Sequence, residues 1–539
     1  MTATQWLLFI AAIQVIHFLG TWKLYVRAGR KAWEAAVPVY NAVVLMKIIN
    51  RPWWWTILLF IPIVNLMMFP IVWVETARSF GFNTYKDTFL TVITCGLYLF
   101  YINYATDAPY IENRELMPKS ANGEWTSSIL FAIIAATVVH TYFMQPFTIP
   151  TSSLEKTLLV GDYLFVSKFH YGARTPITTV ATPMLHDTIP FTKQKSYLSW
   201  PQLPYFRLPG FQSIKRNDIV VFSWPIDTME VITPGFERGN VRKPIDKKSN
   251  YVKRCVGLPG DSLEVRDGYV YINGERNELP DRARLQFSYI VTSSKPMVLN
   301  VQSAYGAFTT VDPFYNEQYD ITDIQYDPRI SSQGNYVNYV QLTDENKEKL
   351  NNNPSTINIE KNKRNSNRGS SRLFPWGGDH QWSIDEYGPI YIPKKGETTV
   401  INQETIPYYK RLIEVYEGSE LGIDNKITQN NGQILLNGNP LTEYTFKLDH
   451  YWMMGDNRHN SQDARSWGYV PYTHVMGKPV MVWLSLDQNK SFPNNIRWDR
   501  MFTTVGGNGP LVSYLWVVGL LIFAYIAWSF FKSRRNKKA

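Results

Sequence analysis

Three hydroxyl residues stand together shortly after an apolar segment. Thr151, Ser152 and Ser153 follow Pro150 within the stretch 147–162. Ser and Thr favour helix caps and turns because their side chains bond nearby backbone groups, so a Ser-rich turn alone indicates only local structure. A serine at the point where the chain leaves a bilayer is also well placed as a nucleophile. That second interpretation requires a base, because serine is a weak nucleophile at neutral pH without one.

The base could be a histidine or a lysine. The eight histidines form neither a Gly-x-Ser-x-Gly elbow nor a His-Glu-x-x-His motif, and His459, in a polar turn, is expected to make surface hydrogen bonds. Lys253 lies in an alternating, partly apolar stretch, 251–261, that ends at a Gly-Pro-Gly turn. Burial can lower the pKa of a lysine by several units and so provide a neutral amine. Lys253 and Arg254 must face opposite sides of a strand; the alternative is that both are solvated edge charges.

A polar loop follows a third apolar strand, over residues 453–468. Its density of Asp, Asn, Arg and Gly indicates a hydrogen-bonded loop that fixes neighbouring groups. Asp463 and Arg465 are spaced to pair, and Ser461 could hydrogen-bond a neutral lysine. The acidic residues fit no calcium-loop spacing, and the two cysteines have no partners at metal-ligand spacing.

Together these stretches resemble the bacterial type I signal (leader) peptidases, membrane-bound Ser–Lys endoproteases that remove signal peptides. The similarity covers 147–171, 215–225, 251–274 and 431–487, in the order of the family. Its most specific parts are the Gly-Asp-Asn-Arg-x-Asn-Ser-x-Asp-x-Arg loop from Gly455 and the Lys-Arg-x-Val-Gly-Leu-Pro-Gly-Asp stretch from Lys253. Lys215-Arg-Asn-Asp-Ile-Val-Val-Phe222 adds a third signature.

The resemblance implies a role for each matching residue. Ser153 is the nucleophile and Lys253 the general base, with no metal or organic cofactor. The Thr151 hydroxyl and the Ser153 backbone N–H stabilise the tetrahedral intermediate. Support for the site comes from Ser461, Asp463 and Arg465. Shallow pockets for small, Ala-like substrate residues are lined by Ile149, Pro150, Leu154, Leu158 and Val252.

Two features depart from the family. Where the family usually has Ser-Met-x-Pro-Thr, this chain has Ser153-Leu-Glu-Lys-Thr157, which creates a Ser-x-x-Lys pair and makes Lys156 a rival base. The Ser-x-x-Lys motif belongs to penicillin-binding enzymes, but their Ser-Asp-Asn and Lys-Thr-Gly motifs do not occur here. The second departure is a larger membrane region and a long insert, on which the resemblance is silent.

Five apolar segments are candidate membrane spans: 4–22, 52–74, 88–104, 129–143 and 511–531. Pro62 and Pro70 could kink the second or make it re-enter, and the alternative for the short segment 88–104 is a buried core helix. The first reads as a retained anchor, since it lacks a cleavage pattern. Basic residues from Lys23 to Arg51, and the basic tail 532–538, are expected in the cytoplasm by the positive-inside tendency. Four spans before Ser153 then put both the N-terminus and Ser153 outside, in agreement with the tail.

We therefore predict three parts. Residues 1–143 form an N-terminal multi-helix membrane region, and 510–539 form a C-terminal transmembrane helix with a basic tail. Residues 144–509 form a mostly β extracytoplasmic catalytic domain with a large insert at about 276–425. Within the insert, 344–372 is expected to be a solvated loop, and 267–274 and 431–438 are expected to be hairpins with turn residues flanking a short strand.

The predicted function is that of a signal peptidase I in the cytoplasmic membrane, multi-pass, with signal peptides of exported preproteins and the lipid bilayer as partners. Contact with the export machinery is left open. The net charge of +10 admits nucleic acid, but no nucleic-acid motif supports it. The alternative is a catalytically silent binding or assembly protein on the same scaffold. Self-cleaving repressors share the chemistry, but membrane spans argue against a DNA-binding regulator.

Overall fold

The computed structural model describes residues 3–117, 120–192, 194–227, 243–295, 297–300, 310–311, 319–327, 329–332, 334–363, 373–376 and 380–536. They divide into two compact units. The first contains residues up to Phe143 together with Arg174–Leu208 and residues 243–247. The second contains Met144–Ala173, the described residues from Pro209 to Asp227, and the chain from Lys248 onward.

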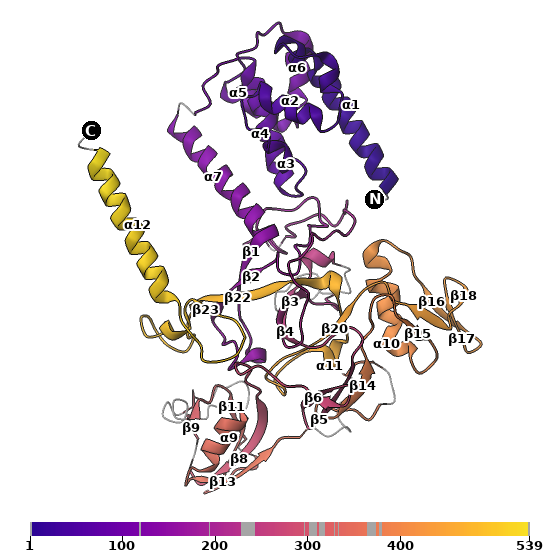
Figure 1. Ribbon diagram of the computed structural model, residues 1–539, viewed down its shortest axis with the longest axis vertical. Coiled ribbons are helices and arrows are strands. Elements are labelled where there is room, and N and C mark those ends of the chain that lie inside the picture. Colours follow the sequence, from indigo (N-terminus) through magenta and orange to yellow (C-terminus); the bar gives the residue numbers. More distant parts are fainter. Residues whose placement is uncertain are drawn as a thin grey trace. The chain divides into compact units, whose positions relative to one another are not determined.

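The first unit is built from helices (Figure 1). Their bounds are α1 Ala3–Arg27, α2 Tyr40–Ile48, α3 Trp55–Leu58, α4 Val64–Ser79, α5 Tyr85–Ile93, α6 Tyr98–Ala105 and α7 Ala121–Val138, which continues as a π-helical turn over Val139–Phe143. Buried apolar side chains from α1, α2, α4 and α6 form one core cluster, including Tyr25, Met46 and Ile102.

Among the described residues, three helices are long and apolar enough to span a membrane: Thr4–Arg27, Ala121–Phe143 and Leu515–Lys532. The predicted segment 88–104 is instead a pair of helices, α5 and α6, bent by 116°. The predicted span 52–74 is not a single helix: α3 ends at Leu58 and α4 begins at Val64. Pro62 has no N–H to donate, and Ile63 has a φ of 71°, which interrupts a right-handed helix.

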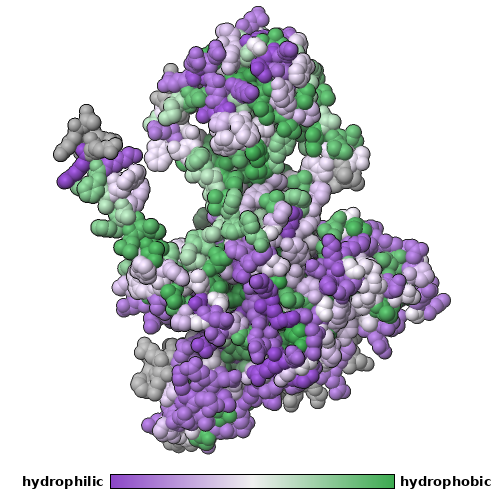
Figure 2. All heavy atoms as spheres, in the orientation of Figure 1, coloured by the Kyte–Doolittle hydropathy of each residue, from purple (hydrophilic) through white to green (hydrophobic). Residues whose placement is uncertain are grey.

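The C-terminal helix α12, Leu515–Asn536, is apolar over its first turns and polar toward its end (Figure 2). Together with the apolar N-terminal helices it makes the chain a membrane protein.

The second unit is mostly β-sheet, as predicted. Its main sheet has the order β1-β2-β22-β3-β4-β20-β21, with β23 also paired to β22. The strands are β1 Met144–Thr148, β2 Asp162–Ser167, β3 Ile219–Ser223, β4 Asn250–Gly257, β20 His450–Met454, β21 Val470–Pro471, β22 Val475–Ser485 and β23 Thr503–Thr504. Strands far apart in sequence are therefore neighbours, and β4 lies between β3 and β20.

Both predicted hairpins are present. β5 Ser262–Arg266, β6 Tyr269–Ile272 and β7 Glu275–Arg276 form one meander, which β14 Tyr387–Tyr391 joins; β16 Ile427–Asn430, β17 Gln433–Leu436 and β18 Asn439–Pro440 form another. Each of their four turns carries Asp-Gly or Asn-Gly with positive φ at both residues, for example 49° at Asp267 and 80° at Gly268. This is the two-residue turn whose twist matches that of the strands.

The insert contains a separate sheet with the order β11-β12-β8-β13 (Figure 1). Its strands are β8 Phe287–Ser293, β11 Ile324–Tyr326, β12 Tyr336–Leu342 and β13 Thr356–Lys361. The prediction of a solvated loop is wrong for the first part of 344–372, where α9 (Asp344–Asn351) and β13 form; 364–372 lie outside the described residues. The Thr343 side chain caps α9, and Leu350 is buried, which the polar composition obscured.

The remaining elements are short. They are β9 Val298–Asn300, β10 Thr310–Val311, β15 Thr398–Val400, β19 Glu443–Thr445, α10 Ile406–Arg411 and α11 Ala464–Trp467.

Candidate active site

A 3-10 turn over Ser152–Leu154 presents Ser153 between β1 and β2. These strands pair in antiparallel fashion, Met144 opposite Ser167 and Thr148 opposite Tyr163, so the segment between them is a closed loop on the sheet edge. Gly161 begins the return at a φ of 87°, and a Cβ there would lie 1.9 Å from the Leu486 carbonyl oxygen. Only glycine fits this close approach. Gly161 thus fixes the point at which the loop that carries Ser153 returns to the sheet.

Ser153 and Lys253 are in direct contact. The Lys253 Nζ lies 2.5 Å from the Ser153 Oγ, and the two residues are 3% and 7% exposed. Lys253 lies in β4, opposite Val220 of β3, which fixes the height of its side chain along the sheet. Sequence positions 100 residues apart are therefore joined through the strand order of the main sheet.

The surroundings of Lys253 favour a neutral amine. Burial lowers the pKa of Lys253 to about 8, against the opposing influence of Asp463 and Asp456. Arg465, which is cationic and nearby, lowers the pKa further. A lysine with a pKa near 8 is partly unprotonated at neutral pH and can accept the serine proton.

Arg254, the next residue, occupies the other face of β4. Its guanidinium bonds Asp456 at 2.6 and 2.8 Å, and both side chains are almost fully buried. The interpretation of Lys253 and Arg254 as solvated edge charges is therefore wrong, since β4 is an interior strand between β3 and β20.

The loop after β20 holds a second buried ion pair. Asp463 bonds Arg465 through two contacts of 2.8 and 2.9 Å, and it also accepts a hydrogen bond from the Gly455 N–H. Arg465 in turn donates to the carbonyl oxygens of Arg458 and Ile384. The predicted pairing of Asp463 with Arg465 is present in the structure, and it closes the loop upon itself.

The same loop reaches the nucleophile segment. The Asn457 N–H donates to the Ser153 carbonyl oxygen at 3.1 Å, and the Asn457 side chain donates to the Ser152 carbonyl oxygen. A Cβ on Gly455 would lie 2.5 Å from the Ser153 carbonyl oxygen and 2.2 Å from the Ser461 Oγ. The absence of a side chain at Gly455 is what allows these three segments to meet.

For two predicted support residues, the described part of the chain shows no hydrogen bond to the Ser153–Lys253 pair. The Ser461 Oγ is buried, and no hydrogen-bond partner for it lies among the described residues. Thr151 has extended backbone and an exposed side chain that makes no capping bond. Both hydroxyls adjoin the site, and their roles stay predictions.

The predicted pocket residues fall into two groups. Ile149, Leu154 and Leu158 are buried in one apolar cluster, and the half-buried Val252 packs against it. Pro150 is exposed. Four of the five residues therefore lie in or against one apolar cluster, and their role in substrate binding stays a prediction.

The rival lysine points elsewhere. Lys156 Nζ pairs with Asp320 Oδ1 at 2.6 Å, so its ammonium group is held by the insert and not by Ser153. Its φ is 69°, a value that proline cannot adopt. The backbone conformation at position 156 therefore excludes the proline that the family usually has there.

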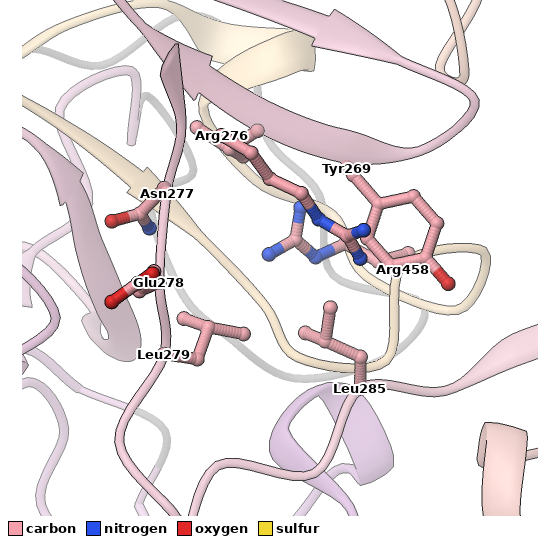
Figure 3. A pocket seen from close by; sticks show the side chains of 8 residues that line it. Tyr269, Arg276, Asn277, Glu278, Leu279, Leu285 and Arg458 are labelled. Atoms are coloured by element: carbon pink, nitrogen blue, oxygen red, sulfur yellow. The ribbon is translucent and has the colours of Figure 1, made fainter.

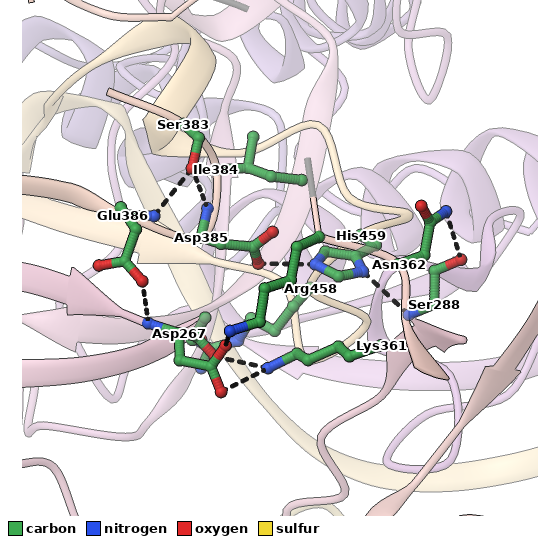
Figure 4. Close-up of polar contacts among 12 residues, drawn as sticks. Asp267, Ser288, Lys361, Asn362, Ser383, Ile384, Asp385, Glu386, Arg458 and His459 are labelled. Atoms are coloured by element: carbon green, nitrogen blue, oxygen red, sulfur yellow. Dashed lines mark hydrogen bonds and ion pairs between the residues drawn. The ribbon is translucent and has the colours of Figure 1, made fainter. Parts of the chain in front are cut away.

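His459 is buried, which contradicts the prediction of a surface role. Its Nε2 lies 2.7 Å from Asp385 Oδ1, and its Nδ1 accepts a hydrogen bond from the Ser288 N–H (Figure 4). Asp385 and Ser288 belong to the insert, and the Gln286 N–H also donates to the Asp456 carbonyl oxygen. The insert therefore fastens the loop that carries Asp463. Sequence reasoning missed this because nothing local links His459 to a carboxylate 74 positions away.

The site thus has the elements of a serine hydrolase: a buried hydroxyl in contact with a lysine, on a mostly β domain. The sequence model of the signal peptidase, peptidase S26 family matches residues 122–304 and 392–484, about half of the chain. The chain belongs to the S26 signal peptidase family, and is a peptidase of that family. Residues 33–113 match a family of unknown function, DUF5684.

Curated relatives agree with this assignment. The chain is 23% identical over 410 residues to signal peptidase I of Buchnera aphidicola subsp. Acyrthosiphon pisum, covering 74% of this chain and 90% of the relative. It is 25% identical over 378 residues to that of Buchnera aphidicola subsp. Schizaphis graminum, covering 70% and 79%. Signal peptidase I of Rickettsia massiliae is 28% identical over 220 residues, covering 39% and 66%.

Proposed function

We propose that the chain is a signal peptidase I that removes signal peptides from exported preproteins, with Ser153 as nucleophile and Lys253 as general base. The observation that carries the proposal is the contact of 2.5 Å between the two buried groups. Family membership and the names of the relatives support the substrate class. A catalytically silent scaffold would have no reason to keep both groups in contact, so that alternative is not favoured.

The reaction follows from the geometry. Neutral Lys253 accepts the proton of the Ser153 hydroxyl as its oxygen attacks the scissile carbonyl carbon. The resulting oxyanion is stabilised by the Ser153 N–H and the Thr151 hydroxyl; loss of one such donor typically raises the barrier by about 3 kcal/mol. The lysine then gives its proton to the departing amine of the mature protein. Water, deprotonated by the same lysine, hydrolyses the acyl-enzyme and releases the signal peptide.

Substrate selection follows from the apolar lining. Ile149, Leu154 and Leu158 belong to one buried apolar cluster beside Ser153, and we expect the substrate residues one and three positions before the cut to pack against it only if they are small. The extended peptide adds as a strand beside the Ser153 segment, where main-chain hydrogen bonds supply affinity. Its apolar core stays in the bilayer, so enzyme and cleavage site meet at a raised effective concentration.

The membrane topology depends on whether the number of crossings before Ser153 is odd or even. Basic residues 23–51 belong in the cytoplasm and the catalytic domain outside, so the chain must cross an even number of times before Ser153. With α1 and α7 as full crossings, the bent pair α5–α6 is best explained as a re-entrant element that returns to the side on which it began. Two crossings then give the same orientation as the four predicted, with the cytoplasmic basic tail after α12. Preproteins emerge from the membrane on its outer face, and contact of this chain with the export machinery would occur there.

The proposal is tested by cleavage of a purified preprotein in detergent. The wild type should shorten the precursor after a small residue, and Ser153→Ala should lower the rate by at least about 10⁴-fold. Ser152→Ala is the matched control, because Ser152 lies beside the nucleophile and its hydroxyl accepts a hydrogen bond from the Asn460 side chain instead of bonding Lys253. Cleavage by Ser153→Ala at the wild-type rate would place the nucleophile elsewhere. A folded wild type that cleaves no preprotein would support the binding-protein alternative.

A further inference from the structure

The loop that carries Asp463 and Arg465 also contains Arg458. This arginine differs from the two other buried arginines near the site in its ion pairing. Arg254 and Arg465 are buried and each bonds a carboxylate. Arg458 is 1% exposed, yet among the described residues no carboxylate lies within ion-pair distance of it. Its Nη1 donates to the Gly268 carbonyl oxygen at 3.0 Å, and no hydrogen-bond partner for its Nε lies among the described residues.

A buried guanidinium without a counter-ion is unfavourable, because desolvation is not compensated. Burial lowers the pKa of Arg458 to about 10, and the nearby Arg465 contributes to this; Asp456 and Asp463, each already paired with another arginine, oppose the shift only in part. Such a group is expected to find an anion where space allows one.

Space is present. Arg458 lines a cavity of about 460 Å³ together with Tyr269, Val270, Arg276, Asn277, Glu278, Leu279 and Leu285. The guanidinium groups of Arg276 and Arg458 both point into it, between Tyr269 and the two leucines (Figure 3). Arg276 is exposed and Arg458 is buried, so the cavity has one cation at its mouth and one at its closed end.

The acidic residue of the lining does not neutralise this pair. In Figure 3 the side chains of Asn277 and Glu278 point away from the guanidinium groups, and Asn277 bonds Asn217 instead. Arg276 is stacked on the Tyr269 ring, with 4.0 Å from Cζ to the ring centre, a contact that holds the guanidinium over the cavity. The Tyr269 hydroxyl is already bonded to Asp344.

We propose that this cavity is a binding site for a small oxyanion, a carboxylate or phosphate group, held between Arg276 and Arg458. Two guanidinium forks suit the planar or tetrahedral oxygens of such groups. Leu279, Leu285 and Val270 accommodate a short apolar portion attached to the anion. The oxyanion is either a free metabolite-sized molecule or the headgroup of an anionic lipid.

Binding is measured by calorimetry on the full chain in neutral detergent, with inorganic phosphate, hexanoate and phosphatidylglycerol micelles as probes. Wild type should bind at least one probe, and Arg276→Glu should weaken binding by at least about tenfold, since it removes a charge-assisted contact. Arg266→Ala is the matched control: Arg266 is stacked on Tyr271 in the same meander, but it does not line the cavity.

The probes separate the two sources. Binding of phosphate or hexanoate identifies a soluble anion, and binding of the micelles alone identifies a lipid headgroup. No binding of any probe to the wild type would overturn the proposal, as would binding that Arg276→Glu leaves unchanged or that Arg266→Ala weakens equally.

Occupancy has an expected consequence for catalysis, which rests on the proposed function. Arg458 follows Asn457, whose N–H bonds the Ser153 carbonyl oxygen, so an anion that fixes Arg458 steadies the nucleophile segment. The probe that binds should raise cleavage by the wild type and not by Arg276→Glu. Binding itself is also measured on Ser153→Ala, so a failure of the peptidase assignment leaves the binding result intact and distinguishable.

Discussion

Two lysines near β4, Lys248 and Lys253, are about equally buried but have different hydrogen-bond partners. Lys248, just before β4, is 4% exposed, and Lys253, within β4, is 3% exposed. Lys248 Nζ bonds Glu420 at 2.6 Å and the Pro225 carbonyl oxygen at 2.9 Å, and it lies 3.3 Å from His474 Nε2. Lys253 bonds a neutral hydroxyl, and its nearest described carboxylates act only at longer range.

The difference shows what turns a buried lysine into a base. Burial lowers the pKa of both amines, but Glu420 opposes this for Lys248. Although burial raises the pKa of Glu420, His474 and Lys248 hold it at about 2, so the carboxylate stays charged. Lys248 is therefore part of a buried ion pair with a structural role. Lys253 lacks such a partner, and burial leaves it ready to take a proton.

The comparison predicts its largest effect at Lys253. Lys253→Ala should lower preprotein cleavage by at least about 10⁴-fold, because the base is lost while the fold is kept. Lys253→Arg should be equally inactive, since a guanidinium stays charged and cannot act as base. Cleavage rates are measured alongside thermal unfolding in detergent. Activity retained by either variant would mean that another group deprotonates Ser153.

For the ion pair of Lys248 with Glu420 we expect an effect on stability. Glu420→Gln leaves Lys248 buried without its anion and should destabilise the domain by about 3 kcal/mol, the order found when one partner of a buried pair is removed. Chemical unfolding of the full chain in detergent measures this loss. At a temperature where the variant is folded, its cleavage rate should match that of the wild type. If Glu420→Gln lowered the cleavage rate as much as Lys253→Ala does, the assignment of a purely structural role to Lys248 would be wrong.

The pH dependence of cleavage follows from the pKa of Lys253. With a value of about 8, the lysine is mostly protonated below that pH and cannot act as base. The value of kcat/KM should therefore fall about tenfold per unit as the pH drops below 8, reaching about 100-fold at pH 6, and level off above 8. The contribution of Lys253 to the free energy of unfolding also rises with pH. Its pKa is about 8 in the folded chain and 10.5 when exposed, so between these values the unfolded chain binds more protons than the folded one. A rise in pH across this range therefore favours the folded state.

A smaller effect is expected at the contact between insert and loop. His459→Ala removes the bridge between Asp385 and the Ser288 N–H and should reduce cleavage by about tenfold and stability by about 2 kcal/mol. The reason is that the loop bearing Asp463 and Asn457 loses one of its anchors. His380→Ala is the control, since His380 bonds Tyr408 within the insert and does not reach the loop. Equal effects of both variants would show that the insert does not support the site.

The sequence was sufficient for the parts of the site that depend on local pattern. Alternation in 251–257 placed Lys253 and Arg254 on opposite faces, and the spacing of Asp463 and Arg465 predicted their pairing. Asn-Gly and Asp-Gly dipeptides predicted both meanders, because few residues other than Asn, Asp and Gly tolerate positive φ. Ser153 and Lys253 were brought together by resemblance, since strand order is not written in any local signal.

The sequence was not sufficient where long-range contacts decide. The burial of His459 depends on Asp385 and Ser288, which a polar turn does not reveal. α9 formed in a stretch whose composition predicted a loop, because one buried leucine and a Thr343 cap sufficed. Two prolines in the predicted span 52–74 allowed a kink, and the structure divides the span at Ile63, beside Pro62, whereas α4 continues through Pro70. Mean hydropathy records how apolar a segment is, but not whether its backbone can stay helical.

The smallest effect is expected at Lys156, the rival base. Residues 154–157 form a turn in which the Thr157 N–H donates to the Leu154 carbonyl oxygen and Lys156 holds a φ of 69°. Its ion pair with Asp320 joins a buried amine to a carboxylate that is 65% exposed, so solvent screens the pair and its contribution is about 0–1 kcal/mol. Lys156→Ala should therefore change kcat/KM by less than about threefold. Lys156→Gly should be at least as active and slightly more stable, because glycine adopts the left-handed turn without strain. A loss with Lys156→Ala as large as that with Lys253→Ala would reverse the assignment of the base, whereas a loss with Lys156→Gly alone would show that the turn needs the backbone restraint that a Cβ provides.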